Sequence, residues 1–346
     1  MIRMLWNSPS VLVHEFFSGG GCQEATIPPD IAGEGLAMLK ALLSDFRRWG
    51  RFRTLTTLDA RLQNITLPAD HVVRVDNVGY QDTLAALIAQ SRLALLVAPE
   101  NDGILSSLSM LCEQAGVPLL GSLPNGADIA GDKWECHRIL TDAGIQTPPT
   151  WRVNFETADR VAAEAGFPLV IKPIDGAGSE GVGLVKDPSS LTQAMQKAML
   201  KDRCFLLQRY LDGRHFSVSL LVSHEDAVAL SLNEQHIHIG TSFVYQGGRI
   251  LETNLQGHPA GVTARRAVSL VRGLRGWVGV DMVLSRGKWY VIEINPRITT
   301  PYVGLRQAVS VNLAEAIWRA CRKGEFQAPV TLDKKVVFNK EKLMNA

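Results

Sequence analysis

Polar residues near the C-terminal end of the chain have types and spacing suited to binding a cation. Glu293 and Asn295 are two residues apart in an apolar segment, so on a strand both side chains project from one face. Asp281 lies in the preceding apolar segment, and the short glycine-containing connection at 285–288 is typical of a three-residue hairpin loop. Such a loop would bring Asp281 to the same face as Glu293, directly opposite it or one step diagonal.

This acidic cluster favours a magnesium site. Like charges held together cost energy unless a cation lies between them, and oxygen ligands select a hard cation such as Mg²⁺. We therefore predict that Asp281, Glu293 and Asn295 bind metal. The alternative is a structural network of ion pairs, for which Arg297 is the candidate partner.

A glycine-rich segment at 176–181 matches the spacing G-x-G-x-x-G of dinucleotide-binding loops. That motif requires a helix after it, whereas 182–185 has the residue types of a strand, so we reject the dinucleotide interpretation. A loop of small residues between antiparallel strands can instead close over a nucleotide and offer backbone N–H groups to its phosphates. Lys172, on the strand before the loop, would add a positive charge. The alternative is a surface hairpin without a ligand.

The composition is that of a globular protein with two or three domains. The chain has 346 residues, 46% hydrophobic and 20% charged, which is too long for one core and too apolar for a disordered chain. Its 36 basic and 34 acidic residues give a formal charge of +2, which argues against nucleic acid or a membrane surface as a main partner. The longest apolar runs are far short of the roughly 20 residues that span a bilayer. The five cysteines are widely spaced and favour a reducing cytoplasm.

The first third of the chain alternates predicted strands and helices. We expect strands at 11–17, 72–75, 93–98 and 117–120, and helices at 36–46, 83–90 and 105–115. This alternation favours an open parallel sheet with helices on both faces. Ligands bind such sheets beyond the carboxyl ends of the strands, here 18–21 and 99–103. The alternative is that the glycines in the first of these loops only turn the chain.

Beyond residue 120 the pattern changes to consecutive strands. We expect a helix at 128–143 and a proline-containing linker at 147–149. Successive strands without intervening helices imply an antiparallel sheet. The strands are expected at 167–173, 182–186, 204–211, 215–222, 227–232, 278–284 and 289–295, and the remaining helices at 191–200, 264–274 and 313–322.

These elements divide the chain into an N-terminal α/β domain and two smaller units. The first domain would span 1–122, a small subdomain with the glycine-rich segment 123–200, and a larger subdomain with the metal site 201–330. A polar, lysine-rich tail would follow at 331–346.

The ordered series of motifs resembles the ATP-grasp family over about residues 99–322. The resemblance implies an N-terminal open parallel sheet followed by two subdomains whose antiparallel sheets enclose ATP. The segments that carry it are AGDKW at 130–134, GIQTP at 144–148, PLVIKP at 168–173, the glycine-rich segment at 176–183, QRYLDG at 208–213, VD at 280–281 and EINPR at 293–297.

The resemblance also implies roles for single residues. Asp281, Glu293 and Asn295 would hold two Mg²⁺ ions, for which Mn²⁺ could substitute. Arg297 would be catalytic by stabilising an acyl phosphate and the oxyanion that follows, and Lys172 would assist the reaction. Lys133 and Lys172 would bind the phosphates of ATP, and the glycine-rich segment would cover them through Gly176, Gly178, Ser179 and Gly181. The adenine would be bound by Gln208, Arg209, Tyr210 and Leu211. His215 would contact the ribose, at the position where the family usually has a Glu.

A narrower similarity, to tyramine–glutamate ligases of methanofuran biosynthesis, is carried by HEFFSGGG at 14–21, IP at 27–28, EGLAML at 34–39 and NPRITTPYVGL at 295–305. It implies an ATP-dependent amide bond between the side-chain carboxylate of glutamate and the amine of tyramine or tyrosine. The reaction would pass through an acyl phosphate and release ADP and phosphate. The acceptor would be bordered by Ser18, Gly19, Gly20, Thr299, Thr300 and Tyr302.

The expected partners are therefore small molecules, and a homodimer is the assembly to test. Two alternatives stay open. One is an ATP-grasp ligase for another pair of amino acid and amine. The other is a nucleotide-binding sensor without catalysis, which the combined presence of Asp281, Glu293, Asn295 and Arg297 disfavours, because binding alone does not require both carboxylates.

Overall fold

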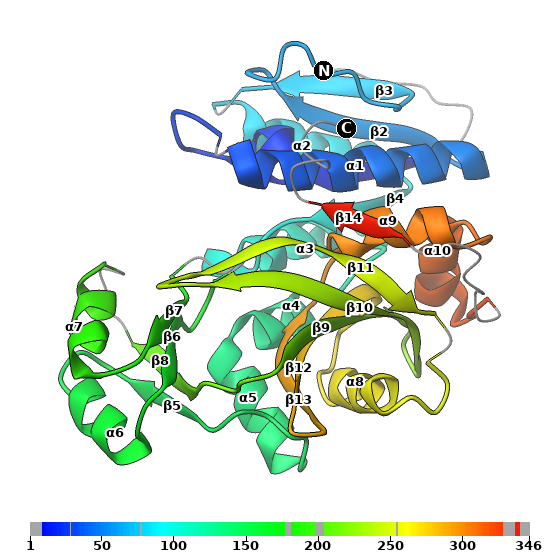
Figure 1. The fold of residues 1–346 in the computed structure, drawn as a ribbon. Helices are drawn as coiled ribbons and strands as arrows, with labels where there is room; N and C mark the ends of the chain where they lie inside the picture. The colour runs from blue at the N-terminus through cyan, green and yellow to red at the C-terminus, as the bar shows by residue number, and fades with distance from the viewer. Residues whose placement is uncertain are drawn as a thin grey trace.

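The computed structural model describes residues 9–27, 29–76, 78–176, 181–197, 204–253, 255–327 and 336–339. The described residues form three sheets, and Figure 1 shows the N-terminal sheet at the top, the large sheet below it and the small sheet at the lower left. Within these ranges, no helix is both long and apolar enough to cross a membrane.

The N-terminal sheet joins four described strands in the order β3-β2-β1-β4, and each pair is parallel. Helix α1 packs on one face, and α2 and α3 pack on the other. The open parallel sheet expected from the sequence is confirmed. The elements are β1 (Ser10–Glu15), α1 (Pro29–Trp49), β2 (Arg53–Asp59), β3 (His71–Val75), α2 (Tyr80–Gln90), β4 (Leu93–Val97) and α3 (Ile104–Gln114).

The structure differs from the sequence prediction at two places in this sheet. Strand β2 was not expected, because its threonines mask the apolar pattern, although Thr54, Thr56 and Thr57 are all buried. The strand expected at 117–120 forms only one isolated bridge, between Leu119 and Ala94.

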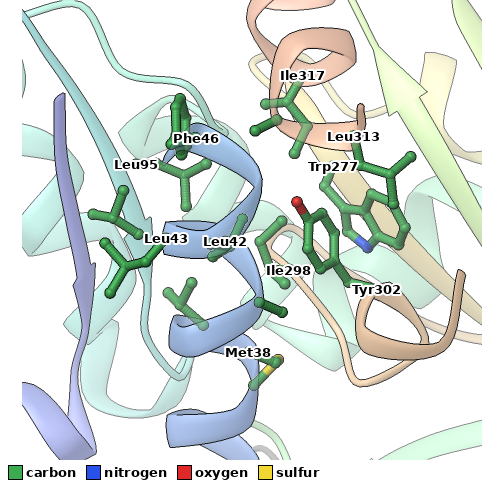
Figure 2. Close-up of a cluster of buried hydrophobic side chains, with 14 of the residues drawn as sticks. Met38, Leu42, Leu43, Phe46, Leu95, Trp277, Ile298, Tyr302, Leu313 and Ile317 are labelled. Atoms are coloured by element: carbon green, nitrogen blue, oxygen red, sulfur yellow. The ribbon is translucent and has the colours of Figure 1, made fainter. Parts of the chain in front are cut away.

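Helix α1 packs both on the N-terminal sheet and on the large domain. Figure 2 shows Leu43 of α1 near Leu95 of β4, with Trp277 and Tyr302 on the opposite side of the helix. Leu43 and Tyr302 have no exposed surface, and Leu95 and Trp277 are almost fully buried. The N-terminal domain and the large domain therefore share one hydrophobic core.

The large sheet joins six described strands in the order β13-β12-β9-β10-β11-β14, and every pair is antiparallel. Helices α4, α5 and α8 contribute to the core on one face, and α9 and α10 to the core on the other. The elements are α4 (Pro124–Gly131), α5 (Lys133–Asp142), β9 (Arg214–Val222), β10 (Ala227–Ile239), β11 (Phe243–Glu252), α8 (Pro259–Ser269), β12 (Gly276–Ser285), β13 (Lys288–Asn295), α9 (Pro301–Ala308), α10 (Leu313–Lys323) and β14 (Val337–Asn339).

The structure corrects the sequence prediction at two places in this domain. The single helix expected at 128–143 is divided into α4 and α5 at Asp132. Part of the expected polar tail is the edge strand β14, which pairs with β11.

The small sheet joins four described strands in the order β5-β8-β6-β7. Strands β6 and β7 flank the glycine-rich segment and pair antiparallel, as expected. Strand β8 lies between β5 and β6, so this sheet continues past the boundary expected at residue 200. The elements are β5 (Thr150–Val153), α6 (Ala158–Ala165), β6 (Leu169–Pro173), β7 (Gly183–Val185), α7 (Pro188–Lys197) and β8 (Phe205–Arg209).

The β10–β11 hairpin of the large sheet extends toward the small sheet, where Figure 1 shows its tip near β7. A single antiparallel bridge joins Ser242 at the tip to Gly183 of β7. This contact holds the strand that follows the glycine-rich segment beside the large sheet.

Candidate active site

The two acidic residues predicted to bind metal lie directly opposite one another. Asp281 on β12 is the register partner of Glu293 on β13. The hairpin turn has two residues rather than the three expected, because Ser285 pairs with Lys288.

A β-bulge restores the pairing that the shorter turn would have changed. Continued without a bulge, the register of the two-residue turn would place Ile292 opposite Asp281. The structure has a register shift between Asp281 and Met282, which brings Glu293 into that position. The predicted juxtaposition is therefore confirmed, although the turn from which it was inferred was wrong.

The Asp281 carboxylate is half-buried within a hydrogen-bonded group. Gln235 Nε2 donates to its Oδ1 at 3.0 Å, and Asn295 Nδ2 lies 3.3 Å from its Oδ2 as a second donor. Burial, together with the negative charge of Glu293 and a hydrogen bond to it, raises the pKa of Asp281 to about 8. A cation between the two carboxylates would remove this repulsion.

This donor set fits Mg²⁺. The described residues contain no group of three or more His, Cys, Asp or Glu side chains placed to hold a metal by themselves. Magnesium is usually held by one or two carboxylates together with substrate phosphates and water. Asp281, Glu293 and the amide oxygen of Asn295 match that pattern.

Two lysines lie on the opposite side of the candidate site. Lys172 of β6 is 4% exposed, and its Nζ donates to Gln208 Oε1 at 3.1 Å. Burial lowers the pKa of Lys172 to about 8 against the opposing effect of Glu293. Lys133 Nζ lies 3.8 Å from Glu293 Oε2 and donates to the carbonyl of Gly176. Lys133 therefore links β13, which carries Glu293, to the start of the glycine-rich segment.

The division between α4 and α5 determines the position of Lys133. Asp132 has an extended backbone, and its carboxylate accepts hydrogen bonds from the backbone N–H groups of Trp134 and Glu135, both at 2.9 Å. This N-cap starts a new helix at Lys133. The Lys133 backbone N–H also donates to Ile174 O at 3.0 Å, which attaches the helix start to the segment after β6.

Arg297 pairs with a carboxylate that the sequence did not single out. Its Nε lies 3.0 Å from Glu100 Oε1 as an ion pair without a hydrogen bond, and its Nη2 donates to Glu100 Oε2 at 3.2 Å. We call this two-point contact the Glu100–Arg297 fork. Gly131 permits this arrangement, because a Cβ there would lie 3.1 Å from the Cβ of Glu100. Among the described residues Arg297 makes no direct ion pair with Asp281 or Glu293, although the charges of both act on it, and Glu293 pairs with Lys133 instead. The only sequence signal for Glu100 was its place in the predicted ligand-facing segment at 99–103.

The predicted nucleotide residues differ in what they contact. Gln208 bridges Lys172 and Thr150, donating to Thr150 Oγ1 at 2.8 Å. The Arg209 guanidinium donates to the carbonyls of Ala165 and Gly166 at the end of α6, so its side chain is engaged within the small domain. Tyr210 and Leu211 follow β8 and are half-buried.

His215 and the glycine-rich segment complete the predicted nucleotide set. His215 is half-buried on β9, and its Nε2 has no hydrogen-bond partner among the described residues. Gly176 and Gly181 lie at the two described edges of the glycine-rich segment. Gly178 and Ser179 lie outside the described residues.

The first predicted acceptor segment packs closely on its own strand. Ser18 donates to Glu15 Oε2 through its backbone N–H at 2.7 Å and through its hydroxyl at 2.6 Å. Gly19 lies against His14, where a Cβ would be 2.6 Å from the imidazole. Gly20 is buried in the same turn, η1 (Phe17–Gly21). The turn therefore requires its small residues for packing around β1.

The second predicted acceptor segment lies at the start of α9. Thr299 Oγ1 accepts a hydrogen bond from Trp277 Nε1 at 3.1 Å, and Thr300 Oγ1 lies 3.4 Å from Glu34 Oε2 as its donor. Tyr302 is fully buried in the core drawn in Figure 2, and its hydroxyl donates to Asp45 Oδ2 at 2.8 Å. The structure thus places the two threonines near the site and the Tyr302 side chain within the core.

Further residues enter the site from elements far apart in the sequence. Burial, followed by the negative charges of Glu34 and Asp281, raises the pKa of Tyr245 well above its usual value. Tyr245 of β11 is half-buried and packs against the core that α1 shares with the large domain. Tyr245 and Gln235 carry no local motif, so the sequence offered no signal for their roles.

The chain matches two family models that are consecutive in its sequence. A pre ATP-grasp 3 domain matches residues 52–126, and an ATP-grasp domain matches residues 130–301. The first covers part of the parallel sheet, and the second covers the small sheet and most of the large one.

Individual relatives and a solved structure agree with these models. The chain is 29% identical to tyramine–L-glutamate ligase of Methanocaldococcus jannaschii over 94% of this chain and 93% of the relative. It is 34% identical to the ligase of the same name from Methanocaldococcus fervens over 63% of this chain and 62% of that relative. An ATP-grasp superfamily protein from Archaeoglobus fulgidus superposes with a TM-score of 0.67 at 26% identity, covering 96% of this chain and 99% of that one. The chain therefore belongs to the ATP-grasp family and is an ATP-dependent, ADP-forming ligase.

Proposed function

We propose that this ligase joins a carboxylate to an amine, and that its substrates are the side-chain carboxylate of L-glutamate and the amine of tyramine or tyrosine, in the biosynthesis of a methanofuran-type cofactor. The similarity to tyramine–L-glutamate ligases over most of the chain supports the choice of substrates. The observation that carries the chemistry is the opposed, half-buried pair Asp281 and Glu293, with Lys172 and Arg297 beside it.

ATP would lie between the small and large sheets. Lys172 and Lys133 supply positive charge for its phosphates, and backbone N–H groups of the glycine-rich segment would cover them. The adenine would contact 208–211, mainly through the backbone, because the Arg209 side chain is engaged with the end of α6. His215 Nε2 would donate to or accept from a ribose hydroxyl.

The acidic pair would hold two Mg²⁺ ions, or Mn²⁺ in their place, through Asp281, Glu293 and Asn295. The ions would neutralise the phosphates and the charge that develops during phosphoryl transfer. Gln235 orients Asp281 by donating to its Oδ1, so that its Oδ2 is turned toward Asn295.

The reaction would proceed in two steps. An oxygen of the glutamate side chain attacks the γ-phosphorus, and ADP leaves as the acyl phosphate forms. The uncharged amine then attacks the acyl carbon, the nitrogen loses a proton to solvent or to the departing phosphate, and the tetrahedral oxyanion collapses as the bond to phosphate breaks. Arg297 would stabilise that oxyanion, because the Glu100 fork fixes its guanidinium and its own positive charge acts in a buried site.

We also propose a cellular compartment and an oligomeric state for the protein. The widely spaced cysteines support a reducing cytoplasm. A homodimer is the proposed assembly, to be checked by light scattering of the purified protein.

A panel of carboxylates and amines tests the function directly. Purified protein is mixed with ATP and Mg²⁺, and ADP release and product mass are recorded for each pair. Glutamate with tyramine or tyrosine is expected to give ADP and the corresponding γ-glutamyl amide. Turnover only with other pairs would redirect the substrate assignment. Absence of ADP with every pair would contradict catalysis and favour a nucleotide sensor.

A further inference from the structure

A row of polar side chains crosses the large sheet on the face that carries Asp281. Asp281 is the register partner of Ser217 on β9, and Ser217 is the partner of Asn233 on β10. In the adjacent row, Ser219 of β9 pairs with Ser231 of β10. We call Ser217, Ser219, Ser231 and Asn233 the polar row.

The opposite face of the same strands is apolar. Phe216, Val218, Leu232 and Met282 alternate with the polar row and lie in a hydrophobic core with α8. The period of two along each strand therefore divides the sheet into a packing face and a polar face that is continuous with the metal ligands.

The polar row is buried but its hydrogen bonding is incomplete. The four residues are between 0% and 4% exposed. Asn233 Nδ2 donates to Ser217 Oγ at 3.2 Å and to Ser219 Oγ at 3.0 Å. Asn233 Oδ1 and Ser231 Oγ have no hydrogen-bond partner among the described residues. An unpaired buried polar group destabilises a fold, so the polarity of this row calls for a further partner.

The position of the polar row relates it to the reaction centre. Asn233 lies two strands from Asp281 in one register row, which corresponds to about 10 Å. Thr299 lies over the same region, because a Cβ on Gly279, the register partner of Ser219, would be 2.9 Å from the Thr299 side chain. The row therefore begins beside the metal ligands and Thr299, on β12, and extends across β9 to β10.

We propose that the polar row is a subsite for a hydroxyl group at the far end of the amine substrate. This inference rests on the proposed function, since it assigns the part of the amine that is remote from the reacting nitrogen. Asn233 Oδ1 accepts a hydrogen bond from the ligand hydroxyl, and Ser231 Oγ donates a hydrogen bond to the hydroxyl oxygen.

The chemistry of the two unpaired atoms selects a hydroxyl over other groups. A hydroxyl both donates and accepts, which matches one amide acceptor and one serine hydroxyl. None of the four side chains in the row is charged, so the row has no counter-charge for a carboxylate or an ammonium group buried against it. Tyramine, a phenol with a two-carbon chain that ends in an amine, is long enough to place its nitrogen near Asp281 and its hydroxyl near Asn233.

Binding of matched amines tests the subsite. Tyramine and phenethylamine differ only in the hydroxyl, and each is titrated by calorimetry into the protein with Mg²⁺ and a non-hydrolysable ATP analogue. We expect wild-type protein to bind tyramine about tenfold or more tightly than phenethylamine. Phenethylamine has no hydroxyl, so the polar atoms of the subsite stay unpaired when it binds. Ser231→Ala and Asn233→Ala should each weaken tyramine binding toward the phenethylamine value and leave phenethylamine binding unchanged.

Controls separate recognition from damage to the fold. Ser231→Ala removes an unpaired hydroxyl, so its melting temperature without ligand should equal or exceed that of wild type. Val218→Ala, on the packing face of the same sheet, should lower the melting temperature and keep the preference for tyramine. Retention of the full preference by a folded Ser231→Ala protein would overturn the assignment.

Product formation measured in parallel distinguishes the subsite from the proposed function. Selective tyramine binding without amide product would uphold the subsite and refute the proposed reaction with tyramine. Amide formation from both amines without a binding preference for the hydroxyl would uphold the reaction and refute the subsite. Failure of both amines to bind would refute both.

Discussion

The small and large sheets bury charges of opposite sign on the two sides of the candidate site. The small sheet holds Lys172, whose amino group donates to the Gln208 amide, and the large sheet holds Asp281 and Glu293. Burial moves the pKa of both Lys172 and Asp281 to about 8, toward the neutral form in each case. Keeping Lys172 and Asp281 charged therefore costs free energy when no ligand is bound. A metal-bound nucleotide would reduce this cost, because its phosphates are negative toward Lys172 and its metal is positive toward Asp281.

The acidic side of this comparison should have the largest effect on activity. Asp281→Asn or Glu293→Gln should lower kcat about a thousandfold or more, because a bound metal supplies several kcal/mol of transition-state stabilisation. The measurement is ADP release at saturating ATP and Mg²⁺, with circular dichroism as the check on folding. Glu225→Gln on the surface serves as the control. Activity close to wild type at the same Mg²⁺ concentration would remove the metal assignment.

Arg297 tests whether the large sheet also supports the second chemical step. Arg297→Met should lower kcat about 10²–10³-fold, since it removes a preorganised donor to the oxyanion. The apparent KM for ATP should change little. Arg265→Met on α8 is a matched exposed control. An equal loss in kcat and in ATP affinity would instead indicate that Arg297 positions the nucleotide.

The basic side of the comparison should show its cost in stability. Lys172→Met should stabilise the ligand-free protein by about 1–3 kcal/mol while weakening ATP binding, because the lowered pKa of Lys172 corresponds to a folding penalty. The unfolded lysine binds its proton up to pH 10.5 and the folded one up to about 8. The penalty is therefore complete below pH 8 and disappears as the pH rises toward 10.5.

Urea unfolding at pH 7 and pH 10 measures this difference. The gain from Lys172→Met should be smaller at the higher pH, whereas Lys186→Met on the surface should have no effect at either pH. A Lys172→Met protein that is less stable than wild type at pH 7 would show that the buried amino group is not a cost to the fold.

The smallest expected effect concerns a residue outside both sheets. Glu100→Gln should lower kcat about tenfold and leave the KM for ATP unchanged, because it weakens the fork that holds Arg297 without touching the nucleotide. Initial rates at varied ATP separate the two parameters. Glu113→Gln on α3 provides the surface control. Loss of activity in Glu100→Gln that is restored by raising ATP would assign Glu100 to nucleotide binding instead.

The sequence predicted local features of the site better than their long-range partners. The pairing of Asp281 with Glu293 was predictable because both residues lie in one hairpin with alternating apolar residues. The turn length was not, since an extra residue in a bulge and a shorter turn give the same pairing. The contact between Arg297 and Glu100 joins residues 197 positions apart, and no periodicity relates them.

Strand order was equally beyond the local pattern. Strand β8 has the apolar run of a buried strand, and the boundary expected at residue 200 placed it in the larger subdomain together with β9. It instead enters the small sheet between β5 and β6. Which sheet a strand joins depends on tertiary packing, and period-two alternation within the strand does not record it.

The Glu100–Arg297 fork has a consequence for protein engineering. The carboxylate of Glu100 comes from the N-terminal domain, and the guanidinium of Arg297 comes from the segment after β13. Neither domain therefore carries the complete contact. A chimera that exchanges the N-terminal domain for that of a relative would have to bring along a carboxylate of matching length and angle. Domain-exchange experiments on this chain should therefore transfer the segments that contain Glu100 and Arg297 together.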